Sequence, residues 1–276
     1  MCRALLYLGS PVLLDNLLYQ PDSALIRQST MPRMLNMLNL AGFGIRAWDP
    51  ASADPQRAFS YYSQSLPVFD RNLQNLAQKV RPSCVLAHNG DLADMARMKP
   101  LLAPRIKPQY LAQIHGTTDS EWIYALLVSQ LNDPHAALAD EEFFKSLAST
   151  LEIIRDARAK LGIAVSSSVN LFVANGTQLA ALRYCFDFGC YRTADPARVH
   201  EANLSFLSLW YTLGRDYALH DGEWKMSGGT ENADSIIVAS EPLTRDTSAW
   251  VELPEYGALF AEMRHGRPRV AVRLLD

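Results

Sequence analysis

The first eight residues constrain this chain most strongly, because they place a cysteine directly before a short apolar segment. The run Arg3–Leu8 (RALLYL) reads as a buried strand behind Cys2. Cysteine is small enough for the initiator methionine to be removed, which would leave a thiol and a free amine on one residue. Such an α-amine, with an ordinary pKa of about 7.7–8.0, can act as general base for its own thiol. The strand would then hold this group at a fixed point.

Length and composition limit what such a site can serve. The chain has 276 residues, is 49% hydrophobic and carries a net charge of -3. It can therefore bury one large core, and it offers no basic field for nucleic acid or an anionic membrane. No apolar run reaches membrane-spanning length, and the N-terminus does not read as a secretory signal. The four cysteines are too few and too scattered for a disulfide framework, so we expect a cytoplasmic protein.

The secondary-structure signals come in blocks and predict an α+β fold of one domain over residues 2–276. Helical signals dominate the first 160 residues, and strand signals dominate the remainder. The helices are expected from Ser10-Pro11, over Ala24–Gln28, after Asp70, after Thr118 and over Glu141–Lys160. The strands are expected at Val169–Ala174 and Gln178–Tyr184 around Asn175-Gly176, at Ser235–Ser240, and at Leu259–Arg264 and Arg269–Leu275 around His265-Gly266.

Three local motifs interrupt these elements. The stretch Asn39–Gly44 (NLAGFG) suggests a tight turn that leads into a strand, or a β-turn and nothing more. A buried strand over Ser83–Leu92 breaks at His88-Asn89-Gly90, where the alternative is a hairpin turn. In Gly116–Glu121 (GTTDSE), Thr118 and Glu121 predict a capping box, and Asp119 falls at the helix N-terminus, where an acid also simply complements the helix dipole.

Taken together, the motifs resemble the class II glutamine amidotransferases. The resemblance rests on Met1-Cys2-Arg3, on the three motifs above and on Ala239–Leu243 (ASEPL), in this order along the whole chain. It is closest to the stand-alone branch, which includes bacterial γ-glutamyl hydrolases and the amidotransferase-like subunit of the fungal glutathione-degrading complex. It implies an N-terminal-nucleophile hydrolase with an αββα sandwich, two mostly antiparallel sheets between helical layers, and no cofactor or metal.

The resemblance also implies roles for individual residues. Cys2 would attack a γ-glutamyl amide, with the Asn89 side chain and the Gly90 N–H as the oxyanion hole. Losing one such donor costs about 2.7–4 kcal/mol of barrier. Asp119 would hold the α-ammonium of the substrate. The remaining substrate-binding positions are Thr118, Asn39 and Gly42.

One departure from the family pattern follows Ala87. Family members carry an Ala-His-x-Arg strand, a His-Pro-Phe loop and a second strand that ends in His-Asn-Gly, whereas here Val85-Leu86-Ala87-His88 runs directly into Asn89-Gly90. A strand-loop-strand therefore reads as missing, and with it the arginine that clamps the substrate carboxylate. Arg71 and Arg97 are the candidate replacements. The explanations are a mis-spliced or mis-assembled reading frame, a true loss that gives an inactive homologue, or a shifted substrate. We favour the first two, because the flanking motifs are intact.

Two other interpretations compete with this one. Cys84, His88, Cys185 and Cys190 could supply four zinc ligands, although buried structural cysteines explain them better. The more serious alternative is an inactive scaffold that keeps the fold to bind a peptidase-like partner subunit. Because no synthase domain follows in this chain, hydrolysis of glutamine or a glutathione-like γ-glutamyl compound is favoured over amide transfer.

Overall fold

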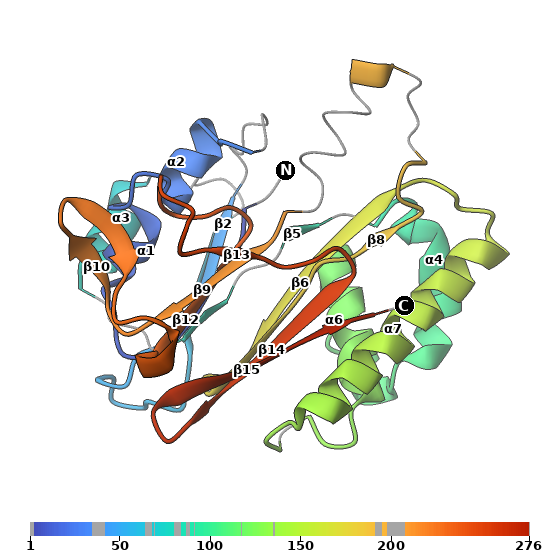
Figure 1. Ribbon diagram of the computed structural model, residues 1–276. Coiled ribbons are helices and arrows are strands. Elements are labelled where there is room, and N and C mark those ends of the chain that lie inside the picture. The colour runs from blue at the N-terminus through green and yellow to red at the C-terminus, as the bar shows by residue number, and fades with distance from the viewer. Residues whose placement is uncertain are drawn as a thin grey trace.

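The computed structural model (Figure 1) describes residues 3–34, 42–63, 68, 70–79, 84–86, 89–90, 92–116, 118–134, 136–190, 195–197 and 208–275. For residues 62, 84–86 and 89–90 it describes the backbone alone. The helices are α1 (Leu14–Leu18), α2 (Leu25–Thr30), α3 (Arg71–Ala77), α4 (Met95–Leu102), α5 (Pro108–Leu111), α6 (Asp119–Gln130) and α7 (Asp140–Lys160), with short 3-10 turns at Ala103–Arg105 and Thr230–Asn232.

The strands of the described residues form two large sheets and one small hairpin. The first sheet has the order β13 (Val251–Glu252), β9 (Trp210–Gly214), β12 (Ser235–Ala239), β1 (Leu5–Leu8), β4 (Cys84–Leu86), β2 (Phe43–Trp48), β3 (Phe59–Ser63). The second has the order β15 (Arg267–Leu274), β14 (Gly257–Arg264), β7 (Gln178–Leu182), β6 (Ser167–Ala174), β5 (Asn89–Gly90), with β8 (Cys185–Phe186) also on β6. The hairpin joins β10 (Tyr217–His220) to β11 (Glu223–Met226).

The sheets lie face to face with helices on their outer faces, as Figure 1 shows. One apolar cluster joins α1 and α3 to the outer face of the first sheet, and another joins α4, α6 and α7 to the outer face of the second. A third cluster lies between the sheets. The neighbouring strands pair antiparallel throughout. The predicted mixture of helices and antiparallel sheets is confirmed.

Strand β1 shows why the N-terminal run is apolar without alternation. Leu5 and Tyr7 pack toward the outer helices, whereas Leu6 and Leu8 pack between the sheets. Because successive side chains of a strand point to opposite faces, a strand covered on both faces must be apolar at every position. The predicted strand behind Cys2 is therefore confirmed, and it lies next to β12 near the centre of the first sheet.

The long helix α7 agrees with its prediction, and its end explains the glycine that follows. Gly162 has φ +62, its N–H donates to the Ala159 carbonyl at 3.1 Å, and the Ile163 N–H donates to the Arg158 carbonyl at 2.9 Å. These two bonds form a Schellman motif, which satisfies carbonyls that the helix itself leaves unpaired. Glycine adopts the left-handed conformation without steric cost.

Several element boundaries differ from the predictions. Helix α1 begins at Leu14, beyond Pro11, and the cap of α2 is Ala24 without a side-chain bond. The prolines after Arg97 read in the sequence as a break, yet this stretch is largely helical, with Pro100 inside α4. In the β6–β7 hairpin the two loop residues are Gly176 and Thr177, one position later than predicted, because Asn175 pairs with Gln178. These boundaries depend on packing and local hydrogen bonds that the apolar pattern does not encode.

Candidate active site

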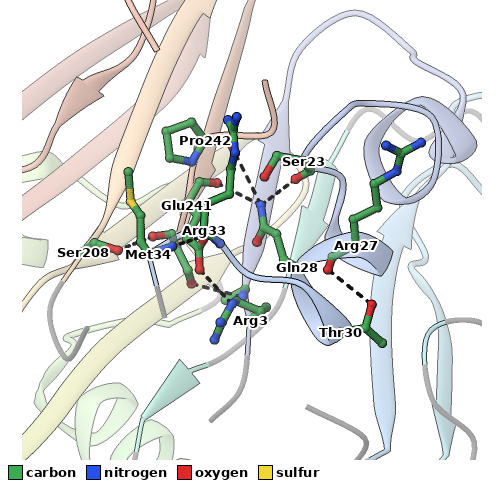
Figure 2. A network of polar contacts seen from close by, with 12 residues as sticks. Arg3, Ser23, Arg27, Gln28, Thr30, Arg33, Met34, Ser208, Glu241 and Pro242 are labelled. Carbon is green, nitrogen blue, oxygen red and sulfur yellow. Dashed lines mark hydrogen bonds and ion pairs between the residues drawn. The ribbon is translucent and has the colours of Figure 1, made fainter. Parts of the chain in front are cut away.

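Arg3 is the first described residue, and its side chain lies inside the protein. Its Nε is 3.1 Å from Oε1 of Glu241, and the two side chains are 2% and 1% exposed. Figure 2 shows the two side chains in contact; Glu241 belongs to the Ala239–Leu243 motif and follows shortly after β12. Charges are buried this completely only when they are paired, because an isolated charge loses its hydration without compensation. The Arg3 side chain is therefore held at a fixed point.

The second oxygen of Glu241 holds a further segment. Its Oε2 accepts hydrogen bonds from the backbone N–H groups of Arg33 at 3.1 Å and Met34 at 3.2 Å. Gln28 reaches the same turn from α2: its Nε2 donates to the Ser23 carbonyl at 2.7 Å and to the Glu241 carbonyl at 3.3 Å. One carboxylate thus connects the start of the chain, residues 33–34 and the turn after β12.

A chain of polar contacts continues from this turn to the second sheet. The Ser240 hydroxyl accepts from the Ala4 N–H at 3.1 Å, and the Ser240 N–H donates to the Ala4 carbonyl at 3.0 Å. The Ser208 hydroxyl donates to the Ser240 carbonyl at 2.6 Å, and Asn170 Nδ2 lies 3.5 Å from the Ser208 carbonyl. Asn170 belongs to β6, so these contacts join the two sheets where β1 begins.

The candidate oxyanion residues lie on the strand that pairs with Asn170. In the register of β5 and β6, Asn89 is opposite Asn170 and Gly90 is opposite Val169. The preceding strand β4 belongs to the other sheet, and only residues 87 and 88 separate the two strands. The run that was expected to break at His88-Asn89-Gly90 therefore contains two short strands in different sheets, and the alternative of a plain hairpin turn does not apply.

Asp119 lies against the residues that follow Gly90. Its Oδ2 accepts a hydrogen bond from the Leu92 N–H at 2.7 Å, and its Oδ1 accepts from the Ser120 N–H at 2.7 Å. Asp119 is the first residue of α6, where the partial positive charge of the helix favours a carboxylate. The residue is half-buried, and a carboxylate has more acceptor positions than these two bonds use. The structure thus brings Asp119 next to the candidate oxyanion segment.

The predicted capping box is wrong in its partners. Thr118 is the N-cap of α6, but its side chain makes no capping hydrogen bond. Glu121 instead accepts from the backbone N–H groups of His115 at 3.0 Å and Gly116 at 2.8 Å. The carboxylate therefore orders the loop before the helix, and Thr118 is exposed beside Asp119.

The remaining predicted residues divide into two groups. Cys2, Asn39 and His88, and the side chain of Asn89, lie outside the described residues. Gly42 is described as a half-buried residue directly before β2. Among the described contacts, none links Gly42 to Asp119 or to β5, so these roles remain predictions.

Arg71 and Arg97 are the candidate replacements for the missing arginine. Their described contacts do not place either of them between the sheets. Arg97 lies on α4, where its guanidinium donates to the Leu161 carbonyl at 3.1 Å and lies 3.6 Å from the Asp94 carboxylate. Arg71 is exposed at the start of α3. Both helices pack on the outer faces of the sheets.

Two residues of this region carry no predicted role. Glu241 was visible only as part of the Ala239–Leu243 motif, and nothing in the sequence connected it with Arg3. Asn170 is 2% exposed, and no side chain or backbone group that the structure describes forms a hydrogen bond with its Oδ1. The signal that could have identified it is a polar residue inside an otherwise apolar strand, because buried amides are rarely left unpaired.

The zinc interpretation gains no support from the cysteines. Cys185 is buried and its Sγ lies 3.2 Å from the Ser166 hydroxyl, whereas Cys190 is exposed. Across the described part of the chain, no three His, Cys, Asp or Glu side chains gather in a way that could hold a metal ion.

None of the described helices combines the length and the apolar character needed to cross a bilayer.

Comparison with known proteins agrees with the motifs. Residues 67–198 match the sequence model of the class-II glutamine amidotransferases. The probable glutamine amidotransferase DUG3 of Saccharomyces cerevisiae is 26% identical, over 92% of this chain and 80% of its own length. The gamma-glutamyl-hercynylcysteine sulfoxide hydrolase of Mycobacterium tuberculosis is 26% identical, over 71% of this chain and 82% of its own length.

A solved structure is similar in fold. The glutamine aminotransferase class-II domain protein from Silicibacter pomeroyi aligns over 100% of both chains with a TM-score of 0.59 and 19% identity. At this identity the likeness concerns the fold alone. The family match, the two relatives and the shared fold together confirm the resemblance drawn from the motifs: this chain is related to the class II glutamine amidotransferases.

Proposed function

We propose that this chain is a single N-terminal-nucleophile domain, residues 2–276 in an αββα arrangement, that hydrolyses a γ-glutamyl amide bond. The Cys2 thiol attacks the amide carbonyl while its own α-amine takes the proton. The carbon–nitrogen bond then breaks, the nitrogen leaves with that proton, and a thioester forms. Water releases glutamate and the free thiol. The Asn89 side chain and the Gly90 N–H stabilise the negative charge on the carbonyl oxygen.

The observation that carries the proposal is the contact between Asp119 and the segment after Gly90. The Asp119 carboxylate accepts from the Leu92 N–H at 2.7 Å, and Leu92 is only two residues after Gly90 of the proposed oxyanion hole. A glutamyl group carries an α-ammonium a short distance from its amide, so it needs an anionic partner near that hole. Thr118, Asn39 and Gly42 complete the substrate pocket in this proposal.

The relatives support the substrate class. One is named as a probable glutamine amidotransferase and another as a hydrolase of a γ-glutamyl compound. Glutamine and glutathione-like γ-glutamyl compounds share the glutamyl end that Asp119 would recognise, so we propose a place in γ-glutamyl or glutathione metabolism. The proposed setting is the cytoplasm.

The arginine segment missing after Ala87 would impair this activity. The alignment with the yeast relative spans 298 positions, more than the 276 residues of this chain, so that relative contains residues with no counterpart here. A substrate carboxylate without its arginine clamp loses a charge-assisted pair, which weakens binding by several kcal/mol in desolvated sites. We therefore expect a high KM for γ-glutamyl substrates.

The test combines mass spectrometry with glutamate release. Intact-mass measurement is expected to show that Met1 is removed, and 6-diazo-5-oxo-norleucine is expected to label Cys2. Glutamate release is then measured on a γ-glutamyl panel with this chain, with Cys2→Ala, and with a form in which the missing segment is restored. Retention of Met1 would contradict the proposed chemistry, because no free amine would then share a residue with the thiol.

The alternative is an amidotransferase-fold scaffold that binds a peptidase-like partner subunit. The observation that favours it is that Asp119 already accepts backbone hydrogen bonds from Leu92 and Ser120, and so has a structural use without a substrate. Met1 removal with a free but unlabelled Cys2 would support the scaffold.

A further inference from the structure

We propose that Glu241 is a positioning residue for the N-terminal cysteine and that it acts through Arg3. This inference deepens the proposed function and rests on it. Glu241 touches neither the substrate nor the reacting atoms in this proposal. Its task is to fix the backbone to which Cys2 is bonded, so that the thiol and the amine meet the substrate in one geometry.

The register of β1 and β12 places this ion pair at the end of the ladder. Leu5 is opposite Ala239, and Ala4 exchanges hydrogen bonds with Ser240 one position further. Continuing the register by one more residue brings Arg3 opposite Glu241. The next residue on that side is Pro242, which has no backbone N–H and cannot continue the ladder as a donor. The Arg3–Glu241 ion pair is therefore the last described contact between the two segments before Cys2.

The fold itself does not require this pair. Four register pairs, from Leu5–Ala239 to Leu8–Ile236, already hold β1 to β12, and apolar clusters cover both faces of β1. Replacing a buried ion pair with apolar side chains of similar size is often neutral or stabilising. We therefore attribute the Arg3–Glu241 pair, whose side chains are 2% and 1% exposed, to the need to hold the backbone next to Cys2 in one geometry.

The second oxygen of Glu241 fixes the orientation of its carboxylate. Because Oε2 accepts from the Arg33 and Met34 N–H groups, the carboxylate is held in orientation and does not rotate about its own axis. Arg3 therefore meets a fixed partner. Positional errors of about 1 Å at a reacting group can cost about 100-fold in rate, so an anchor at the residue next to the nucleophile has a large effect.

The experiment uses the full chain with Glu241→Gln and Arg3→Lys. Glu252→Gln serves as the control, because Glu252 forms another ion pair, with Arg183 at 2.8 Å, that the proposal leaves out of the site. Labelling by 6-diazo-5-oxo-norleucine is measured as a maximal rate and a half-saturation concentration. We expect the maximal rate to fall at least about tenfold in both test variants, with the half-saturation concentration within about twofold and the control unchanged.

A second readout uses the cysteines as internal reporters. Alkylation by iodoacetamide needs no glutamyl pocket, and peptide mass spectrometry resolves each cysteine. We expect Cys2 to react about threefold faster or more in Glu241→Gln, because the released terminus is more accessible. The exposed Cys190 should keep its rate, and the buried Cys185, whose pKa burial raises, should stay unreactive as long as the fold is intact.

The double variant Arg3→Met with Glu241→Leu separates positioning from stability. It removes both charges, so we expect its urea midpoint to return toward that of the wild type while slow labelling by the diazo compound persists. Recovery of stability and labelling together would overturn the proposal, as would unchanged labelling and alkylation of Cys2 in Glu241→Gln. If the diazo compound fails to label even the wild type, the proposed function fails. The iodoacetamide rates of Cys2 still decide whether Glu241 holds the terminus.

Discussion

Glu241 and Asp119 are the two carboxylates of the candidate site, and the protein holds them in different ways. Glu241 is 1% exposed, forms an ion pair with Arg3 and accepts two backbone hydrogen bonds. Asp119 is half-buried at the start of α6, and its described partners are the backbone N–H groups of Leu92 and Ser120 together with the Ser120 hydroxyl. Glu241 is enclosed by the protein, whereas Asp119 as a residue is only half-buried.

The difference assigns the two residues different tasks. A carboxylate has about four acceptor positions, and an enclosed one can use them only on the protein. Glu241 can therefore order the chain but cannot meet a ligand. Asp119 is only half-buried, and the N-terminus of α6 supports its negative charge, so it can meet a ligand ammonium. Four measurements test this division.

The largest expected effect is on stability at the enclosed carboxylate. Glu241→Leu leaves the Arg3 charge buried and removes the acceptor of two N–H groups, so the free energy of unfolding should fall by about 3–5 kcal/mol. Urea denaturation measures this change. Glu252→Leu should cost about 1 kcal/mol or less, because the Glu252 side chain is 48% exposed. Equal losses in the two variants would mean that burial gives Glu241 no special weight.

The second-largest effect should be on the activity that depends on Asp119. Asp119→Asn keeps an acceptor for the Leu92 N–H but loses the charge, so kcat/KM for a γ-glutamyl substrate should fall about 100-fold, or about 2.7 kcal/mol. Asp140→Asn is the matched control, because Asp140 is also the first residue of its helix and accepts from the next N–H. If the control loses as much activity, helix stability and not ligand binding explains the result.

A smaller effect tests what orders the loop beside Asp119. Glu121→Ala removes the acceptor of the His115 and Gly116 N–H groups and should lower the free energy of unfolding by about 1 kcal/mol. Thr118→Val should change it by less than about 0.5 kcal/mol, since the Thr118 side chain makes no capping bond. Thermal unfolding compares the two variants. A larger loss for Thr118→Val would restore the capping box that the sequence predicted.

The smallest effect comes from salt. Raising sodium chloride from about 50 mM to about 500 mM should raise KM about two- to threefold, because mobile ions screen the partly exposed Asp119 charge. The stability difference between wild type and Glu241→Leu should stay nearly constant, since buried pairs are screened much less. Parallel kinetic and urea series provide the comparison. A salt-independent KM would mean that Asp119 does not meet a charged substrate group.

The sequence predicted the parts of the fold that local pattern controls. The apolar run of β1, the strand β12, the hairpin around His265-Gly266 and the long helix α7 all follow from periodicity and turn residues. Asp70 was also identified as a helix start, and its side chain accepts from the N–H groups of Asn72 and Leu73. These features depend on residues close together in the chain.

Several other features could not be predicted in this way. The strands β9 and β13, the hairpin of β10 and β11, and β3 within a polar stretch gave no clear signal. Their pairing depends on neighbouring strands, and sheet propensity is strongly dependent on such context. The partner of Glu121 was also misjudged, because its carboxylate accepts from two N–H groups of the preceding loop, whose path the local pattern does not predict.

The order of the residues alone indicates which chemical groups this protein offers: a cysteine before a buried strand, an Asn-Gly pair, an acid at a helix start and a late ASEPL motif. Folding brings some of these groups together. It placed Arg3 against Glu241 from the opposite end of the chain, and Asp119 against the residues after Gly90. The physical reason is that a buried charge needs a partner in space, and the sequence order carries no record of which distant strand provides it.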